Sequence, residues 1–203
     1  MTNSIQTIFF DFGNVLIDWD YHRIFGRFFP TPQAVDSFLA EVHFPEWNAR
    51  LDAGFPFAEG VAELSARFPQ YAPALHAYDT DWRKGVSGPI PGTVALLRRL
   101  KQAGYPLFVL SNFSAEKFPL MRAEYDFVSL FDEVILSGEH HLVKPNPAFF
   151  QLALRRAGRA ASESLLIDDN LPNIKSARAL GFRTIHFLSP AQLEAELIAM
   201  QIL

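Results

Sequence analysis

IFFDFGNVLIDWD, residues 8–20, is the stretch that decides the fold. Its first three residues are consecutive apolar and aromatic side chains, which is typical of a strand buried on both faces of a parallel sheet. Asp11 follows directly, at the expected carboxyl end of that strand. Because open parallel sheets bind ligands at the carboxyl ends of their strands, we expect Asp11 to take part in chemistry. Gly13 then lets the backbone turn or come close to a bound group.

The composition limits the class of protein. The 203 residues, 49% hydrophobic and 20% charged, are enough for one globular domain with an inserted subdomain. The formal net charge of -4 and the lack of a Lys/Arg cluster argue against a nucleic-acid partner. The chain has no cysteine, so disulfides and thiolate sites are excluded. Residues 1–20 lack a signal-peptide pattern and no apolar run reaches about 18 residues, so we expect a cytoplasmic protein without a membrane partner. No heptad or motif predicts an oligomeric state.

From residue 91 onward, helical and strand patterns alternate. Such alternation predicts a parallel sheet with right-handed crossovers and helices on both faces, an α/β fold. Asn146 and Ser189 are in position to cap two of the helices. Strands are expected at residues 106–110, 133–136, 165–167 and 183–187, and helices at residues 93–102, 114–123, 147–157 and 171–180 and after Ser189.

Residues 21–88 have a different character. Phe and Trp are dense there, and we find no strand pattern. We expect about four helices that form a separate cap, joined to the rest by connectors near residues 18–21 and 85–92. Three of these helices are placed at residues 32–42, 56–68 and 72–84. The predicted domains are an α/β core of residues 1–17 and 89–203 and a helical cap of residues 18–88.

Polar residues mark four strand ends or the loops that follow them. They are Asp11, Ser111 with Asn112, Lys144 before Pro145, and Asp168 with Asp169. Any one of them alone would be an ordinary turn residue or helix cap. Together, in their order, spacing and placement, they resemble the four motifs of the haloacid dehalogenase (HAD) superfamily. The resemblance extends from residue 8 to about residue 181, and the helical insert lies where that family carries its C1-type cap.

This resemblance implies a Rossmannoid core, with the first strand flanked by the strands that carry Ser111 and Asp168. It also implies a Mg²⁺-dependent phosphomonoester hydrolase that forms an aspartyl-phosphate on Asp11. The implied Mg²⁺ ligands are Asp11, the backbone carbonyl of Gly13, Asp169, and Asp168 directly or through water. The residues that would bind the phosphoryl oxygens are Ser111, Asn112, Lys144 and Asn14. Lys144 would also neutralise the crowded carboxylates, and Asn173 would orient the acidic pair.

Gly13 departs from the family's pattern. Active phosphatases of the family usually have a second Asp at this position, which protonates the leaving group and then activates water. Such a proton shuttle is worth about 10²–10⁴-fold in rate. Three explanations stay open: a substrate with a good leaving group, a substitute acid such as Asp18, Asp20 or a cap residue, or loss of phosphatase activity. The D-x-G-N-V form resembles sugar-phosphate phosphatases, notably alpha-D-glucose-1-phosphate phosphatase, whose anomeric phosphate leaves comparatively easily.

Two alternatives remain beside a phosphatase. The 2-haloacid dehalogenases of the family also lack the second Asp, but without a cation Asp168 and Asp169 would repel Asp11, and carbon–halogen cleavage needs no Mg²⁺. A non-catalytic phosphometabolite-binding protein would also explain Gly13. We expect a hydrolase that acts on a small phosphorylated metabolite, a sugar phosphate among the candidates, with Mg²⁺ as cofactor. The cap would set its specificity.

Overall fold

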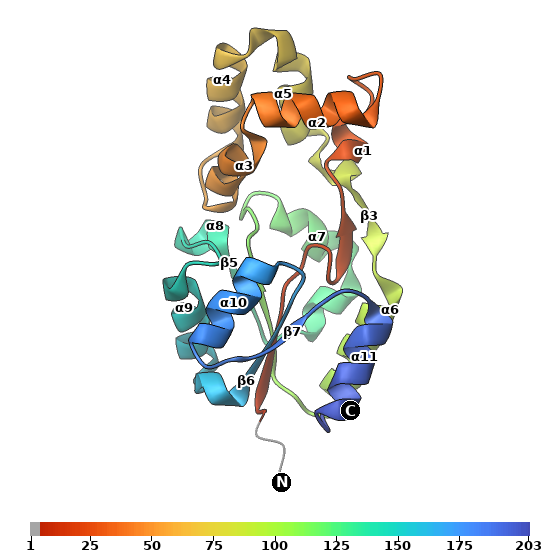
Figure 1. The fold of residues 1–203 in the computed structure, drawn as a ribbon, viewed down its shortest axis with the longest axis vertical. Coiled ribbons are helices and arrows are strands. Elements are labelled where there is room, and N and C mark those ends of the chain that lie inside the picture. The colour runs from red at the N-terminus through yellow and green to blue at the C-terminus, as the bar shows by residue number, and fades with distance from the viewer. Residues whose placement is uncertain (1–4) are drawn as a thin grey trace.

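Parallel strands form the centre of the computed structural model, which describes residues 5–203 (Figure 1). The first four residues of the predicted core lie outside the described part. The five-stranded sheet found among the described residues has the order β5-β4-β1-β6-β7. β1 pairs in parallel with β4 on one side and β6 on the other, so the predicted α/β fold and its central strand are confirmed. The strands are β1 (Thr7–Phe10), β4 (Leu107–Ser111), β5 (Glu133–Leu136), β6 (Ser164–Asp168) and β7 (Arg183–His186).

Helices cover both faces of this sheet, as the consecutive apolar residues of β1 require. Phe9 packs in a cluster with Phe149 and Phe150 of α9 (Pro147–Ala157), on the side where α10 (Leu171–Ala179) also lies. Its neighbours Ile8 and Phe10 point the other way, into the cluster shared with α6 (Pro91–Gln102) and α11 (Pro190–Ala199). β1 is therefore held from both faces, and only its ends are free to meet a ligand.

Two of the predicted helix starts are confirmed by their caps. The Oδ1 atom of Asn146 accepts a hydrogen bond from the Ala148 amide at 3.0 Å, and the Ser189 Oγ accepts one from the Gln192 amide at 3.2 Å. α7 (Phe118–Glu124) begins later than the expected residue 114. The Ser114 hydroxyl accepts a hydrogen bond from the Glu116 amide, and this local turn competes with the first helical turn.

The helices of the insert lie beyond the carboxyl ends of the strands, at one end of the molecule (Figure 1). Their shared interior is aromatic: Phe25 packs against Phe38, Phe44 and Tyr78 at centroid distances of 5.2 to 5.6 Å. The predicted boundaries at residues 18 and 88 stay a prediction. None of the helices in residues 5–203 is long and apolar enough to cross a membrane. The insert contains α1 (His22–Phe25), α2 (Pro32–Glu41), α3 (Phe44–Asp52), α4 (Phe57–Arg67) and α5 (Ala72–Thr80).

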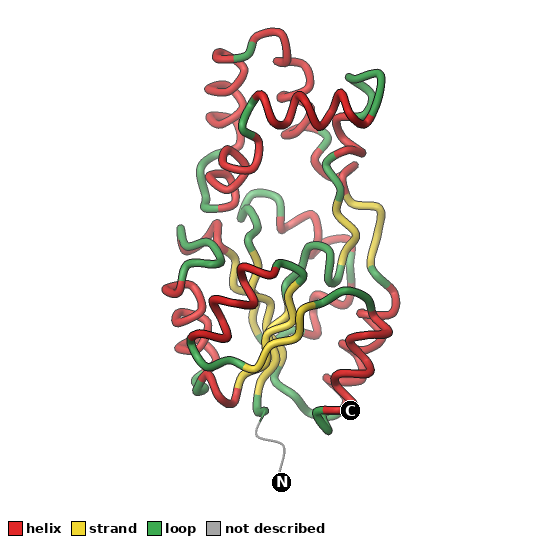
Figure 2. The backbone as a smooth tube through the Cα atoms, in the orientation of Figure 1, coloured by secondary structure: helices red, strands yellow, loops and turns green. Residues whose placement is uncertain are grey.

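The connectors on either side of the insert include two short strands, for which the sequence showed no strand pattern. β2 (Ile17–Trp19) and β3 (Val86–Pro89) pair as an antiparallel ribbon, which lies between the main sheet and the helices of the insert (Figure 2). Arg23 ties the same region together by donating to the Gly85 carbonyl at 2.9 Å. Each strand is so short that no alternating pattern marks it in the sequence. The expected helix at residues 72–84 likewise ends at Thr80 and gives way to a 3₁₀ turn, Trp82–Gly85.

Candidate active site

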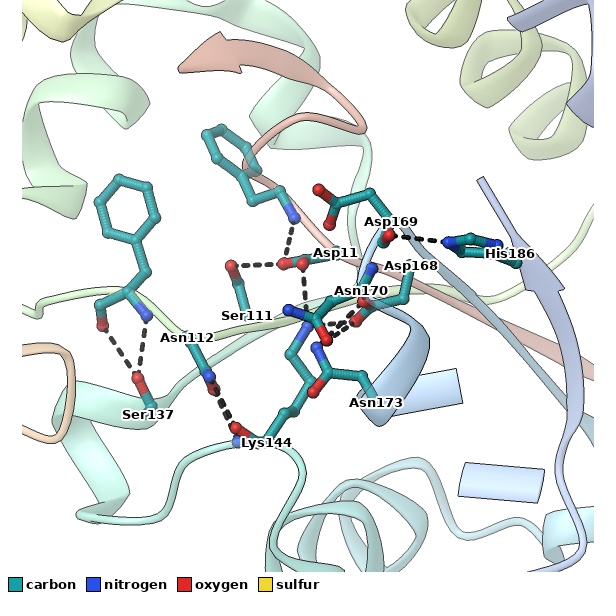
Figure 3. Close-up of polar contacts among 12 residues, drawn as sticks. Asp11, Ser111, Asn112, Ser137, Lys144, Asp168, Asp169, Asn170, Asn173 and His186 are labelled. Carbon is teal, nitrogen blue, oxygen red and sulfur yellow. Dashed lines mark hydrogen bonds and ion pairs between the residues drawn. The ribbon is translucent and has the colours of Figure 1, made fainter. Parts of the chain in front are cut away.

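Three of the predicted polar residues meet because their strands are neighbours in the sheet. Asp11 follows β1, while Ser111 and Asp168 are the last residues of β4 and β6 (Figure 3). The Ser111 hydroxyl donates to Oδ1 of Asp11 at 2.7 Å, and the Phe12 amide donates to the same oxygen at 2.7 Å. The carboxylate of Asp11 is thus fixed at the carboxyl edge of the sheet.

Lys144 comes to this edge from the loop after α8 (Ser137–His140). Its side chain is fully buried, and its Nζ lies 3.1 Å from Oδ2 of Asp11 and 2.6 Å from Oδ2 of Asp168. Burial opposes the charged amine, but Asp11 and Asp168 together raise the pKa of Lys144 above its usual value. Asn112 exchanges two hydrogen bonds with the main chain of Lys144, at 2.9 and 2.7 Å, and so fixes the loop that presents the amine.

The two neighbouring aspartates play different structural parts. Asp168 is fully buried, and besides Lys144 it accepts hydrogen bonds from the Asn170 amide at 2.8 Å and from Nδ2 of Asn173 at 3.0 and 3.1 Å. Asn173 therefore holds Asp168, one member of the acidic pair. Asp169 lines the cavity above the sheet, and its main-chain carbonyl accepts a hydrogen bond from Nε2 of His186 at 2.9 Å. The carboxylate of Asp169 is left available to a ligand in that cavity.

The three aspartates form a cluster in which the carboxylates repel one another. Asp11, Asp168 and Asp169 each present a carboxylate oxygen, and these atoms lie within 4.8 Å of one another. Burial raises the pKa of Asp11 to about 7, with the charges of Asp168 and Asp169 adding to it and Lys144 opposing it. Burial and Asp168 likewise raise the pKa of Asp169. The single amine of Lys144 cannot balance three carboxylates. Their oxygen atoms therefore fit a hard divalent cation such as Mg²⁺.

A cavity of about 380 Å³ opens over this cluster. It is lined on the sheet side by Asp11, Gly13, Asn14, Ser111, Asn112 and Asp169, so the structure brings six of the predicted site residues to one surface, with Lys144 and Asp168 buried beneath. Asn14 has a φ of 55°, and its Oδ1 accepts a hydrogen bond from the Trp19 amide at 3.1 Å, which holds the loop in shape. At Gly13 an added Cβ would meet nothing within 4 Å. The position therefore faces open space.

Residues 5–181 match the family of haloacid dehalogenase-like hydrolases. The chain belongs to this family. The predicted membership is thereby confirmed.

Individual relatives of this HAD-like hydrolase differ in what they do. The chain is 32% identical to the drimenol cyclase of Aspergillus calidoustus over 95% of its own length and 36% of the cyclase. It is 30% identical to a sesquiterpene phosphatase of Aspergillus oryzae over 45% of its length and 47% of the phosphatase. The chain thus spans about a third to a half of the length of these curated relatives.

A solved structure shares the fold. It is a HAD family enzyme from Bacteroides thetaiotaomicron in complex with magnesium and inorganic phosphate. The two chains are 22% identical, the TM-score is 0.71, and the match covers 91% of this chain and 95% of that one.

The opposite wall of the cavity comes from the insert, and the sequence did not indicate that Asp52 and Tyr78 would lie there. Trp19 and Trp82 stack there at a centroid distance of 4.5 Å. Beside them a short relay of hydrogen bonds runs from the Tyr78 hydroxyl to Oδ1 of Asn48 at 2.5 Å, and from Nδ2 of Asn48 to Oδ2 of Asp52 at 2.9 Å. Asp52 and Asn48 are four residues apart on α3, a spacing that places them on one helix face. A carboxylate in the last turn of a helix, where the macrodipole disfavours it, was the available signal.

The structure places the two named candidates for a substitute acid outside the cavity over Asp11. Asp18 accepts hydrogen bonds from the Ser87 hydroxyl at 2.5 Å and from Arg23 at 2.8 Å, and both hold the pKa of Asp18 below its usual value. Asp20 accepts hydrogen bonds from the main chain and ring of His22 at 2.8 and 2.9 Å. Neither residue lines the cavity over Asp11, because each is turned toward the ribbon or the insert.

Proposed function

We propose that this HAD-like hydrolase is a Mg²⁺-dependent phosphomonoester hydrolase that acts on a small phosphorylated metabolite. The observation that carries the proposal is the meeting of Asp11, Lys144, Asp168 and Asp169 under one cavity. A carboxylate nucleophile, an amine for the phosphoryl charge and an acidic pair for a cation are what phosphoryl transfer requires. The sesquiterpene phosphatase of Aspergillus oryzae and the fold neighbour's complex with magnesium and inorganic phosphate support the same chemistry.

In the proposed reaction, Asp11 attacks the phosphorus atom and becomes an aspartyl-phosphate, which water then hydrolyses. The Ser111 hydroxyl and the Lys144 amine contact the Asp11 carboxylate at 2.7 and 3.1 Å, so they lie within reach of phosphoryl oxygens bound next to it. Donors fixed in this way stabilise charge as it develops in the transition state. Asn112 is proposed to act with them, both by fixing Lys144 and from its own place in the cavity lining, where Asn14 also lies.

The proposed Mg²⁺ ligands are Asp11, Asp169 and the Gly13 carbonyl, with Asp168 acting through water. Asp169 is preferred as the direct ligand because both oxygens of Asp168 already accept hydrogen bonds from the protein. A bound Mg²⁺ would reduce the repulsion between the nucleophilic carboxylate and a phosphate dianion. The residues themselves hold the carboxylates in place for it, since Lys144 and Asn173 fix Asp168.

The cavity also constrains the substrate's leaving group. Of the described residues that line it, none is Lys, Arg or His. A second anionic group on the substrate would therefore find no cation beside it. The stacked Trp19 and Trp82 offer an apolar surface, and Asn48 offers an amide. A small neutral alcohol fits this wall, and a sugar monophosphate is one such ester.

A panel of phosphate esters tests the proposal. The wild-type protein is incubated with aryl phosphate, sugar monophosphates and other metabolite monophosphates, with Mg²⁺ or with EDTA, and inorganic phosphate is measured. We expect release that needs Mg²⁺ and that Asp11→Asn abolishes, whereas Asp18→Asn retains it. Absence of release from every ester would favour a binding protein, and halide release from a 2-haloacid without metal would favour a dehalogenase.

A further inference from the structure

When a phosphate ester of an ordinary alcohol is cleaved, the alcohol leaves as an unstable alkoxide unless a proton reaches its oxygen while the ester bond breaks. A positioned acid contributes about 10²–10⁴-fold to such a step. The polar groups on the sheet side are committed elsewhere, because Asp11 attacks and Ser111 and Lys144 face the phosphoryl group. Gly13 has no side chain to offer. The acid therefore has to come from the opposite wall of the cavity.

Asp52 is the carboxyl group on that wall. It is partly buried, lines the same cavity as Asp11, and interacts with Asp11 electrostatically. Within residues 5–203 its side chain accepts one hydrogen bond, from Asn48, and no Lys, Arg or His pairs with it. The ionised form of a carboxyl group is unfavourable at the negative end of a helix dipole and close to other carboxylates. Among the described residues its hydrogen-bonding partner is Asn48, so the rest of the carboxyl group is available to the cavity that it lines.

Although Asp52 belongs to the insert, contacts with the core fix its position. The Ser137 hydroxyl donates to the Asp52 carbonyl at 2.5 Å, and the ring of His141 donates to the Ala53 carbonyl at 2.8 Å. Gly54 follows with a φ of +97°, and a Cβ there would lie 2.6 Å from the Gly138 carbonyl oxygen. The end of α3 thus rests directly on α8. This contact holds the Asp52 carboxyl over the sheet edge that carries Asp11.

We propose that Asp52 is the general acid and base of this site, an assignment that rests on the proposed function. In the first step Asp11 forms a bond to phosphorus, the bond from phosphorus to the ester oxygen breaks, and the proton of the Asp52 carboxyl passes to that oxygen. In the second step a water oxygen bonds to phosphorus, its proton passes to the Asp52 carboxylate, and the bond from phosphorus to Asp11 breaks. The products are the alcohol and inorganic phosphate, and both aspartates return to their starting states.

The protonation state of the residue agrees with this role. Burial raises the pKa of Asp52 to about 8, the charge of Asp11 adds to the shift, and the hydrogen bond from Asn48 opposes it. The carboxyl therefore carries a proton at neutral pH. Tyr78 and Asn48, which face it from the insert, hold the group in one orientation through their relay. Asn48 and Tyr78 are positioning residues in this scheme.

The test compares two esters that differ in their need for a proton. An alkyl phosphate and an aryl phosphate are assayed with saturating Mg²⁺, and kcat/KM is measured because it reports the step in which the ester bond breaks. We expect Asp52→Asn to lower kcat/KM for the alkyl ester by about 10²–10⁴-fold, and for the aryl ester by much less, since a phenolate leaves without a proton. Asp18→Asn, a matched loss of a carboxylate outside the cavity, should change neither value by more than about twofold.

A second variant separates proton donation from structure. The Gly13 position faces open space and can accept a side chain. Adding Gly13→Asp to the Asp52→Asn protein should therefore raise its kcat/KM for the alkyl ester at least about tenfold. An equal loss for both esters, an undiminished alkyl rate, or the same loss in Asp18→Asn would overturn the assignment of Asp52 and leave the phosphatase proposal standing. A wild-type protein that hydrolyses neither ester would overturn both.

Discussion

Replacing Lys144 with methionine removes the amine buried between Asp11 and Asp168 and keeps a linear side chain of similar length. The Lys144 side chain is 0% exposed, and its Nζ lies 3.1 Å from Oδ2 of Asp11 and 2.6 Å from Oδ2 of Asp168. Removing one partner of such a buried pair costs about 3–5 kcal/mol of unfolding free energy, because the remaining charge is left uncompensated. This is a large share of the 5–15 kcal/mol by which domains are typically stable.

The cost should depend on pH in a defined direction. Lys144 lowers the pKa of Asp11 from the value that burial would otherwise impose, so its loss raises that pKa further above about 7. When the pKa of an acidic group is higher in the folded than in the unfolded state, the protein becomes less stable as the pH rises from the lower pKa to the higher one. The variant should therefore be most destabilised near pH 8, and protonation of Asp11 should relieve part of the cost near pH 5.5.

Urea unfolding of metal-free protein, followed by circular dichroism at the two pH values, measures this cost. Lys101→Met is the control, because Lys101 forms a surface ion pair with Asp132 outside the site. We expect the control to lose roughly 1 kcal/mol of unfolding free energy. When Mg²⁺ is added, the Lys144→Met protein should recover part of its unfolding free energy, whereas the control should recover none. A Lys144→Met cost below about 1 kcal/mol, or one that is the same at both pH values, would refute the electrostatic reasoning.

Three further predictions follow from the site and the insert. Asp169→Asn should weaken Mg²⁺ binding at least about tenfold in calorimetric titration, and unchanged affinity would exclude direct coordination by Asp169. Esters with a second anionic group should have a kcat/KM at least about tenfold below that of neutral-alcohol esters, since no cation lines the described cavity; equal values would contradict this. Burial opposes the charged form of His22, but hydrogen bonds with Asp36 and Asp20 raise its pKa overall. The protonated His22 therefore stabilises the fold fully below about pH 6.5, and this stabilisation is lost as the pH rises through the raised pKa. His22→Gln should therefore cost about 0.5 kcal/mol near pH 6 and less near pH 8 by urea unfolding; an equal cost at both would argue for packing.

The sheet side of the site could be predicted because its information is local. A buried strand is a short apolar run, and the polar residue that ends it is visible in the same few letters of sequence. Asp11, Ser111 and Asp168 become neighbours once β1 lies between β4 and β6, and nothing else about the fold is needed. The helix starts at Asn146 and Ser189 were equally local, because a cap bonds only to amides within the next turn.

The insert side could not be predicted because its geometry depends on contacts between distant residues. Asn48 and Asp52 look like a solvated helix face until Ser137 and His141 of the core anchor the end of α3. The pairing of β2 with β3 joins strands that a whole helical insert separates in the chain. Asp18 and Asp20 lie close to Asp11 in the sequence. In space they lie outside the cavity over Asp11.

Detection of a phosphoryl group on Asp11 during turnover tests the central proposal most directly. The protein is mixed with a hydrolysable phosphate ester and Mg²⁺, quenched in acid within one turnover, digested, and examined by mass spectrometry. The account predicts the added mass of one phosphoryl group on the peptide that contains Asp11, and its disappearance with EDTA or in Asp11→Asn. Phosphate release without that adduct, or release that persists in Asp11→Asn, would contradict it.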